Sequence, residues 1–208
     1  RRPDGPCYEL GYAALWLHGP GLDREPDIRD LCRPFLRQLH DLTGESVFLS
    51  VIVGRNHVTI DSVESHGVRV SHNPRGLLVP LHASPASRVL LAALADAEIE
   101  AYIRAASPLR RFTDTTITEP AALREEVALV RRNGFARGYG DHYAHATYVS
   151  FPVLGVGGRP HAAVTVGAPK DRMSDADVER LLPGMQRVMA ALNLQSRLHP
   201  TEPVVRFD

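Results

Sequence analysis

The sequence predicts an α+β fold in which an antiparallel sheet carries helices on its faces. Two blocks rich in β-branched residues, over residues 47–71 and 148–168, flank a middle whose apolar residues recur at helical spacing. Within each block, short glycine-bearing turns separate the strand patterns, and such turns join antiparallel neighbours. Strand-rich blocks around a helical middle are typical of sheets covered by helices.

The composition is that of one globular domain, with 208 residues and 44% hydrophobic content. Basic and acidic residues balance at 24 each, so the chain lacks the basic footprint of a nucleic-acid binder, and we expect little DNA binding by this chain alone. The apolar runs are shorter than the ~20 residues of a membrane helix. Cys7 and Cys32 lie far apart, which predicts free thiols and a reducing cytoplasm. No pattern indicates a cofactor.

The N-terminal part is predicted to hold a linker, a helix and strands. Residues 1–26 are rich in Gly and Pro around one apolar patch, which is typical of a linker with a short helix. Asp27 suits the N-cap of a helix that runs to Leu42 and is closed by Gly44. The strand patterns that follow cover residues 47–53, 58–63 and 68–71, with hairpin chemistry at Gly54-Arg-Asn56.

The best specified helix start lies in the stretch from Gly76 to Leu94. A strand ends at Pro80, and Ser84 then suits the N-cap of a helix with Pro85 at its first position. A helix start carries unpaired N–H groups and partial positive charge. If this one faces a cavity, it is a receptor for a small carboxylate or phosphate.

The C-terminal part is predicted to hold helices and a second hairpin. The expected elements are a helix over 96–105, a helix with Thr118 as N-cap and Gly134 at its end, strands over 148–154 and 161–168, and a last helix opened by the capping box Ser174-Asp-Ala-Asp177. A short Pro-bearing tail follows over 199–208.

Polar rings gather in the segment from Gly138 to Tyr148 more densely than anywhere else in the chain. A ring-rich loop beside a sheet is suited to grip a planar or anionic ligand. Asp141, His142 and His145 have spacing that could also hold a metal, but without a Cys or a second cluster the favoured prediction is no metal.

Seven pieces of the sequence, in order, resemble one known family. The anchor is Gly76-x-x-x-Pro80-Leu-His82-Ala and the helix start after it. The others are Tyr8-Glu-Leu-Gly11, Leu39-x-x-Leu-Thr43-Gly44-Glu45-Ser-Val47, Arg111-Phe-Thr113-Asp-Thr-Thr-Ile117-Thr118, Val130-Arg-x-x-Gly134-Phe135, Tyr148-Val-Ser-Phe-Pro152-Val153 and Ala162-Ala-Val-Thr-Val166-Gly-Ala-Pro169. Together they resemble the effector-binding domain of the IclR family of bacterial transcription regulators.

The resemblance implies a GAF/PAS-like fold over residues 27–198, preceded by a linker over 1–26 and followed by a tail over 199–208. It also implies a winged helix-turn-helix domain that this chain lacks, DNA contact only through that domain, and assembly of the chain with itself into dimers or tetramers. The start at Arg1 without a methionine agrees with a trimmed chain.

The resemblance also implies an effector pocket. Carried over by position, its residues are Val68, Ser71, Val79, Pro85, Ala86, Gly138, Tyr148, Thr165 and Gly167, to which the residue analysis adds His82, Ser84 and His142. His82 alternatively donates to a backbone carbonyl at its turn. We expect Gly138 and Gly167 to open room, and the rings of Tyr148 and His142 to favour an aromatic carboxylate over two- or three-carbon acids.

Other function classes stay open beside the sensor. A metal-responsive domain or a purely dimerising GAF-like domain is one alternative, and a small hydrolase is the least favoured, although Ser84 lies near His82 in the sequence. The chain has no Gly-x-Ser-x-Gly elbow, no P-loop and no H-E-x-x-H motif. The sequence therefore predicts a protein that is not an enzyme.

Overall fold

The computed structural model describes residues 28–65, 76–155 and 158–198. The predicted linker, the tail and the third predicted strand, with Val68 and Ser71, lie outside these residues.

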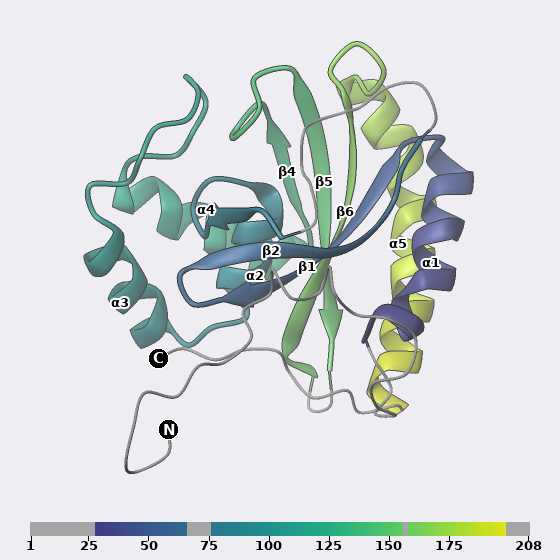
Figure 1. Cartoon of the computed structure of the whole chain (residues 1–208), viewed down its shortest axis with the longest axis horizontal. Coiled ribbons are helices and arrows are strands. Elements are labelled where there is room, and N and C mark those ends of the chain that lie inside the picture. Colours follow the sequence, from purple (N-terminus) through teal and green to yellow (C-terminus); the bar gives the residue numbers. More distant parts are fainter. Residues whose placement is uncertain (1–27, 66–75, 156–157, 199–208) are drawn as a thin grey trace.

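A single antiparallel sheet of six strands organises the described residues, in the order β3-β2-β1-β6-β5-β4 (Figure 1). Its strands are β1 (Ser46–Val53), β2 (Asn56–Val63), β3 (Leu78–Pro80), β4 (Ala136–Tyr139), β5 (Ala146–Leu154) and β6 (Pro160–Pro169). The two predicted hairpins, β1–β2 and β5–β6, form and are joined where β1 pairs with β6. The predicted α+β class is confirmed.

Two helices cover one face of the sheet, namely α1 (Ile28–Thr43) and α5 (Asp175–Leu198). Side chains two residues apart in a strand point to the same face, which is why alternate strand residues enter this core. Its strand members include Val47, Leu49, Val51, Val149, Phe151, Val153, Ala162, Val164 and Val166, packed against Leu36, Leu39, Met185, Met189 and Leu192 of the helices.

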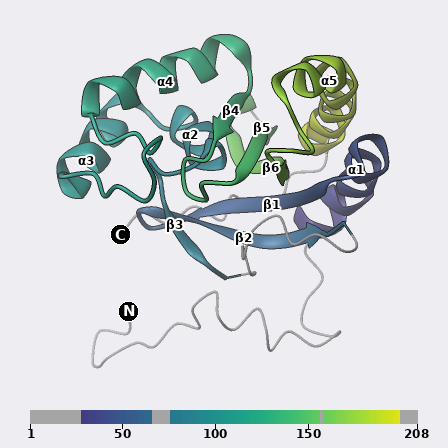
Figure 2. The ribbon, with the colours of Figure 1, turned by 90° about the horizontal axis from the view of Figure 1, so that it is seen from above.

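The other face is covered by α2 (Pro85–Ala92), α3 (Asp96–Ala106) and α4 (Pro120–Asn133). Strands β4 to β6 lie between this group and the α1–α5 pair (Figure 2). A second core forms here around Leu81, Leu90, Ile103, Leu123 and Val127. The sheet therefore separates two cores, and only the α2–α4 side adjoins the cavity described below.

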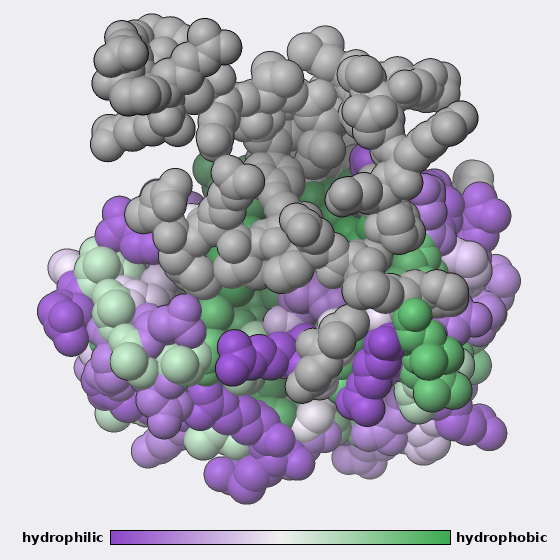
Figure 3. All heavy atoms as spheres, turned by 90° about the horizontal axis from the view of Figure 1, so that it is seen from below, coloured by the Kyte–Doolittle hydropathy of each residue, from purple (hydrophilic) through white to green (hydrophobic). Residues whose placement is uncertain are grey.

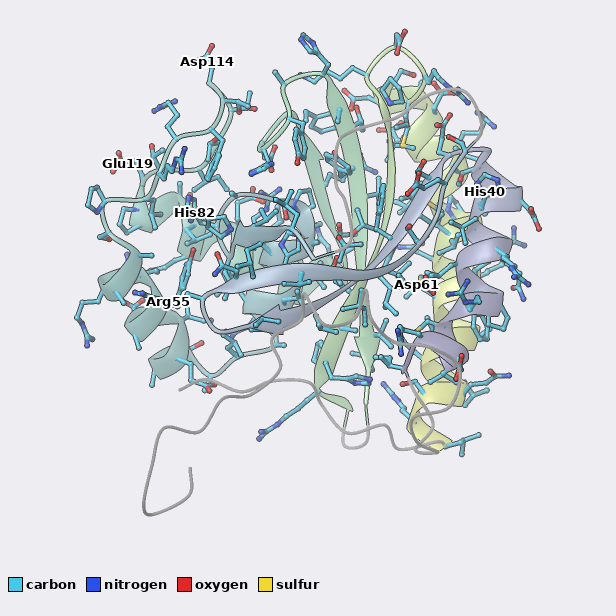
Figure 4. The ribbon with its side chains drawn as sticks, viewed as in Figure 1. His40, Arg55, Asp61, His82, Asp114 and Glu119 are labelled. Atoms are coloured by element: carbon cyan, nitrogen blue, oxygen red, sulfur yellow. The ribbon has the colours of Figure 1, made fainter. Side chains whose placement is uncertain are left out.

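A β-bulge in β2 turns one charged side chain towards α1. The pairing of β1 with β2 shifts between Leu49 and Ser50, so Asp61 stands opposite Leu49 and shares its face of the sheet. There the Nη2 atom of Arg33 donates to the buried Asp61 carboxylate at 2.9 Å. In Figure 4, Asp61 lies on the α1 side of the molecule, far from His82.

Local capping chemistry sets two helix ends as predicted. Ser84 caps α2, its Oγ accepting from the Ser87 N–H at 3.2 Å, and Pro85 takes the first helical position. Gly134 ends α4 with φ of +74°, a conformation that favours glycine. The prediction of Thr118 as the N-cap of α4 is wrong: the N-cap is Glu119, because Pro120 occupies the first helical position.

Strand β4 was not predicted, because the sequence analysis treated Gly138 to Tyr148 as one loop. Gly138 pairs with Tyr148 across β4 and β5. The strand is only four residues long, contains a glycine and has no β-branched residue, so its pattern is too weak to be read locally.

In the view from below, hydrophilic residues lie along much of the lower rim, and hydrophobic residues show in the middle of the face and at its right side (Figure 3). The exposed large hydrophobic side chains among the described residues are Leu42, Leu78, Leu129, Leu194 and Leu198. Within the same residues, no helix has the length and apolar character needed to cross a bilayer.

Candidate functional site

A cavity lies between the α2–α4 face of the sheet and the start of α2, with about 380 Å³ of empty space including the part open to solvent. It is lined by Phe48, Ser50, His57, Val79, Ser84, Pro85, Ala86, His142, Tyr143, Tyr148 and Thr165. Five strands thus contribute to it, together with the start of one helix and the loop between β4 and β5. A hollow lined by aromatic and apolar side chains with few polar groups is of the kind that binds small organic ligands.

His57 is the most deeply buried ionisable side chain of the lining. Its Nδ1 atom lies 2.7 Å from Ser87 Oγ and 3.5 Å from Ser84 Oγ. Burial, with a smaller contribution from His142, lowers the pKa of His57 from 6.5 to about 3. The ring is therefore neutral at physiological pH.

Hydroxyl groups and one backbone amide supply the remaining polarity. Ser50 pairs with Thr59 at 3.4 Å, and Thr165 pairs with Ser150 at 2.8 Å, both between neighbouring strands. In the first turn of α2, Pro85 has no N–H and the Ser84 side chain accepts that of Ser87, so the remaining amide of the turn belongs to Ala86, which is one of the lining residues. No Lys or Arg is among the described lining residues.

Aromatic rings form the opposite wall. The His142 ring stacks on Phe112 with centroids 4.5 Å apart and meets Tyr143 edge-on at 4.5 Å. Arg110 lies over Phe112 at 4.9 Å from the ring centroid. Burial, Arg110 and His82 all lower the pKa of His142, so this ring is also neutral near pH 7.

The segment 107–119, between α3 and α4, holds Phe112 in this place. Thr113 Oγ1 donates to the Gly140 carbonyl at 2.6 Å, and Thr116 Oγ1 donates to the Asp141 carbonyl at 2.6 Å. These bonds tie the segment to the turn that carries His142, so the aromatic wall is built from two connected segments.

His82 does not line the cavity, which corrects its assignment as an effector contact. Its Nε2 atom lies 3.0 Å from the Arg110 carbonyl, and its Nδ1 atom lies 2.8 Å from the Tyr102 hydroxyl. The sequence analysis considered a bond to a backbone carbonyl at the turn of His82, whereas the carbonyl that His82 contacts belongs to Arg110, in the segment 107–119. His82, on the α2–α3 side of the molecule (Figure 4), thus holds the segment 107–119 through its contact with the Arg110 carbonyl.

The Asp141 carboxylate holds α2 in place. Its carboxylate forms a buried ion pair with Arg88, whose Nη2 atom also donates to the Arg137 carbonyl at 2.6 Å. The other Asp141 oxygen accepts from the Tyr139 N–H at 3.0 Å. Across the described residues, no group of three His, Cys, Asp or Glu side chains could hold a metal ion, so the alternative set Asp141, His142 and His145 is not assembled.

Gly138 and Gly167 do not line the cavity, and the room they leave is filled by protein. A Cβ atom at Gly138 would lie 2.3 Å from Pro85 Cγ, and one at Gly167 would lie 2.6 Å from Tyr148 Cε1. The expectation that these glycines open space for a larger ligand is wrong. They let α2 and the Tyr148 ring approach the sheet.

Seven predicted residues meet in the cavity: Val79, Ser84, Pro85, Ala86, His142, Tyr148 and Thr165. Four further lining residues were not predicted as site residues, namely Phe48, Ser50, His57 and Tyr143. Strand alternation could have found two of them, because Phe48 and Ser50 fall on the face opposite Val47, Leu49 and Val51. His57 faces the same side from the neighbouring strand.

These features define a class: an α+β domain with a small-molecule cavity between its sheet and a helix N-terminus. Residues 23–193 match the family model described as the bacterial transcriptional regulator IclR C-terminal domain. The chain therefore belongs to the IclR family, as its C-terminal domain.

Relatives and solved structures agree with this placement. The chain is 31% identical over 159 residues to the HTH-type transcriptional regulator BhcR of Paracoccus denitrificans, covering 76% of this chain and 57% of that protein. It thus spans less than two thirds of the length of that relative. The Thermotoga maritima IclR structure shares the fold with a TM-score of 0.76 at 23% identity, over 82% of this chain and 69% of that one.

A third comparison is with the inducer-binding domain of Acinetobacter PobR, solved as a double mutant in complex with 3-hydroxybenzoic acid. It has a TM-score of 0.73 at 21% identity, over 80% of this chain and 98% of that chain. At this identity, the likeness establishes a shared fold.

Proposed function

We propose that this domain senses a small aromatic carboxylic acid for a bacterial transcription regulator that works in the cytoplasm. The observation that carries the proposal is the cavity at the start of α2, where the Ala86 amide and the helix dipole meet hydroxyl groups from the sheet. These are neutral donors that suit one carboxylate. No described lining residue is a cation, so a ligand with several anionic groups fits less well.

The rings of the lining support an aromatic effector. Phe48, His142, Tyr143 and Tyr148 surround the space, and aromatic pairs gain from edge-on and offset contacts. The PobR domain, which was solved in complex with 3-hydroxybenzoic acid, has the same fold. A two- or three-carbon acid would leave most of these rings without a contact.

In this proposal, DNA is bound by a winged helix-turn-helix domain outside this sequence, and the present domain also joins copies of the chain into dimers or tetramers. The zero net charge of the chain supports this, because DNA binding usually needs basic residues. The match to BhcR supports it as well, because it covers only 57% of that HTH-type regulator. The relatives are regulators, so we infer sensing rather than catalysis.

Isothermal titration calorimetry with benzoate, hydroxybenzoates, pyruvate and glyoxylate tests the proposal. We expect binding of aromatic acids, accompanied by a rise in melting temperature, because a ligand at 100 times its Kd adds about 2.7 kcal/mol to the free energy of unfolding. Binding of the two- and three-carbon acids alone would refute the aromatic class. No binding of any organic acid would refute the sensor proposal.

A further inference from the structure

The Nε2 atom of His57 is a hydrogen-bond acceptor at the cavity. The contacts of the ring show which of its two nitrogens carries the hydrogen. The side chain is 3% exposed and lines the cavity. Its Nδ1 atom is the nitrogen that contacts the serines of α2. Both hydrogen bonds of the ring to other described residues are made by Nδ1, and none is made by Nε2.

Ser87 decides which ring nitrogen carries the hydrogen. Its hydroxyl lies 3.0 Å from the Pro80 carbonyl, which can only accept, so the single hydroxyl hydrogen points there. Ser87 Oγ must then accept from His57 at 2.7 Å, and Ser84 Oγ can donate to it at 3.0 Å. This arrangement satisfies every contact, and it places the hydrogen on Nδ1 and a lone pair on Nε2.

We propose that the effector carries a hydroxyl group that donates a hydrogen bond to Nε2 of His57, so that the sensed compound is a hydroxylated aromatic acid. This inference rests on the proposed function and specifies its ligand. A ligand that fills the cavity shuts water away from Nε2, and an acceptor enclosed without a donor is costly, so a hydroxyl on the ligand removes that cost. A site built in this way rejects analogues that lack the hydroxyl.

The same lone pair orients the ligand. A carboxylate against Nε2 would place two acceptors in contact, so the carboxylate end belongs with the donors of the cavity, which are the Ala86 amide and the hydroxyls of Ser50 and Thr165. The hydroxyl end then points towards β2, where His57 lies.

Calorimetry with matched ligands tests this inference. The set is benzoate, 3- and 4-hydroxybenzoate, and the corresponding methoxybenzoates, whose ether oxygen cannot donate. We expect at least one hydroxybenzoate to bind about tenfold or more tightly than benzoate and its own methoxy analogue. In the variant His57→Phe, the ratio between the affinities for the hydroxybenzoate and for its methoxy analogue should fall to about one.

His161→Phe is the matched control, because His161 is also a buried histidine but does not line the cavity. It should keep the preference for the hydroxyl. If His57→Phe does not fold, titration of the unmodified protein in two buffers of different ionisation enthalpy decides. A hydroxyl on Nε2 takes up no proton, whereas a carboxylate there draws in about one proton per site.

The outcomes separate this inference from the proposed function. Binding of benzoate without any preference for a hydroxyl overturns the inference and leaves the sensor proposal in place. A preference that survives in His57→Phe, or uptake of a proton on binding, overturns it equally. Failure of every acid to bind overturns both.

Discussion

At the scale of single residues, burial determines the charge of His57 and hence the response of the fold to acid. The lowered pKa means that the unfolded chain binds a proton at pH values where the folded chain does not. The free energy of unfolding is therefore retained above pH 6.5 and falls as the pH drops towards 3, by about 1.4 kcal/mol per pH unit from this residue.

Urea unfolding at pH 7.5, 6.0 and 5.0 measures this loss, and we expect a shallower pH dependence in His57→Gln. Replacement of the exposed His145 by Gln is the control for loss of a histidine outside the cavity. An equal slope in His57→Gln and in the unmodified protein would contradict the burial argument.

Gly167 is a second residue on which the cavity depends. In Gly167→Ala, the new Cβ atom would lie 2.6 Å from Tyr148 Cε1 and 3.2 Å from Phe48 Cε2, so both lining rings must move. We expect a loss of about 1–3 kcal/mol in the free energy of unfolding from overpacking, together with weaker effector binding. Urea unfolding and calorimetry on the same variant check both effects. Unchanged affinity would show that these two rings do not contact the ligand.

At the scale of elements, Arg88 fastens the helix that carries the cavity. It joins α2 to the turn after β4 through Asp141 and to α4 through Glu126 at 3.3 Å. Asp141→Ala would leave a buried guanidinium with only the half-exposed Glu126 as its charged partner. We expect a loss of about 3–5 kcal/mol, as for other broken buried ion pairs.

The exposed pair of Arg124 and Glu100, whose atoms approach to 2.6 Å, provides the control. Chemical denaturation of Glu100→Ala should show a much smaller effect, because solvent screens an exposed pair and holding it costs side-chain entropy. Equal losses of stability in Asp141→Ala and Glu100→Ala would mean that burial does not increase the contribution of the Arg88 ion pair to the free energy of unfolding.

Most elements could be predicted because their signals are local. The N-cap at Ser84, the glycine that ends α4 and the capping box at Ser174 each depend on a few neighbouring residues, and the structure confirms all three. Strand β4 depends on distant partners instead. It pairs with β5, and its carbonyls at Arg137 and Tyr139 accept from Arg88 and Thr115. No pattern within residues 136–139 encodes those contacts.

At the scale of the whole molecule, the order of the strands in the sheet brings the lining residues of the cavity together. No single segment of the sequence determines that order. His57 and Tyr148 lie 91 positions apart in the sequence. They line the same cavity because the order β2-β1-β6-β5 places their strands in one sheet. Family resemblance supplied Thr165 and Tyr148, but His57 needed the pairing of β2 with β1. Gly138 and Gly167 were predicted to line the cavity but do not. Their positions in the sequence cannot tell whether protein or ligand fills the space beside them.

Separation of the two cores by the sheet gives a prediction for neighbouring residues of β6. Val164 points into the α1–α5 core, whereas Thr165 points into the cavity. Val164→Ala should lower the free energy of unfolding by about 2 kcal/mol, since two buried methyl groups are lost, and should leave effector affinity unchanged.

Thr165→Val should show the reverse pattern. It keeps the volume of the side chain and removes the hydroxyl that lies 2.8 Å from Ser150, which costs about 1 kcal/mol of stability. The larger effect should be on affinity, because a donor for the carboxylate is lost. Urea unfolding and calorimetry on both variants test this. Val164→Ala should lose more stability than affinity, and Thr165→Val should lose more affinity than stability. If Val164→Ala weakened binding as much as Thr165→Val, the sheet would transmit packing changes between its faces and the cavity would not be energetically separate.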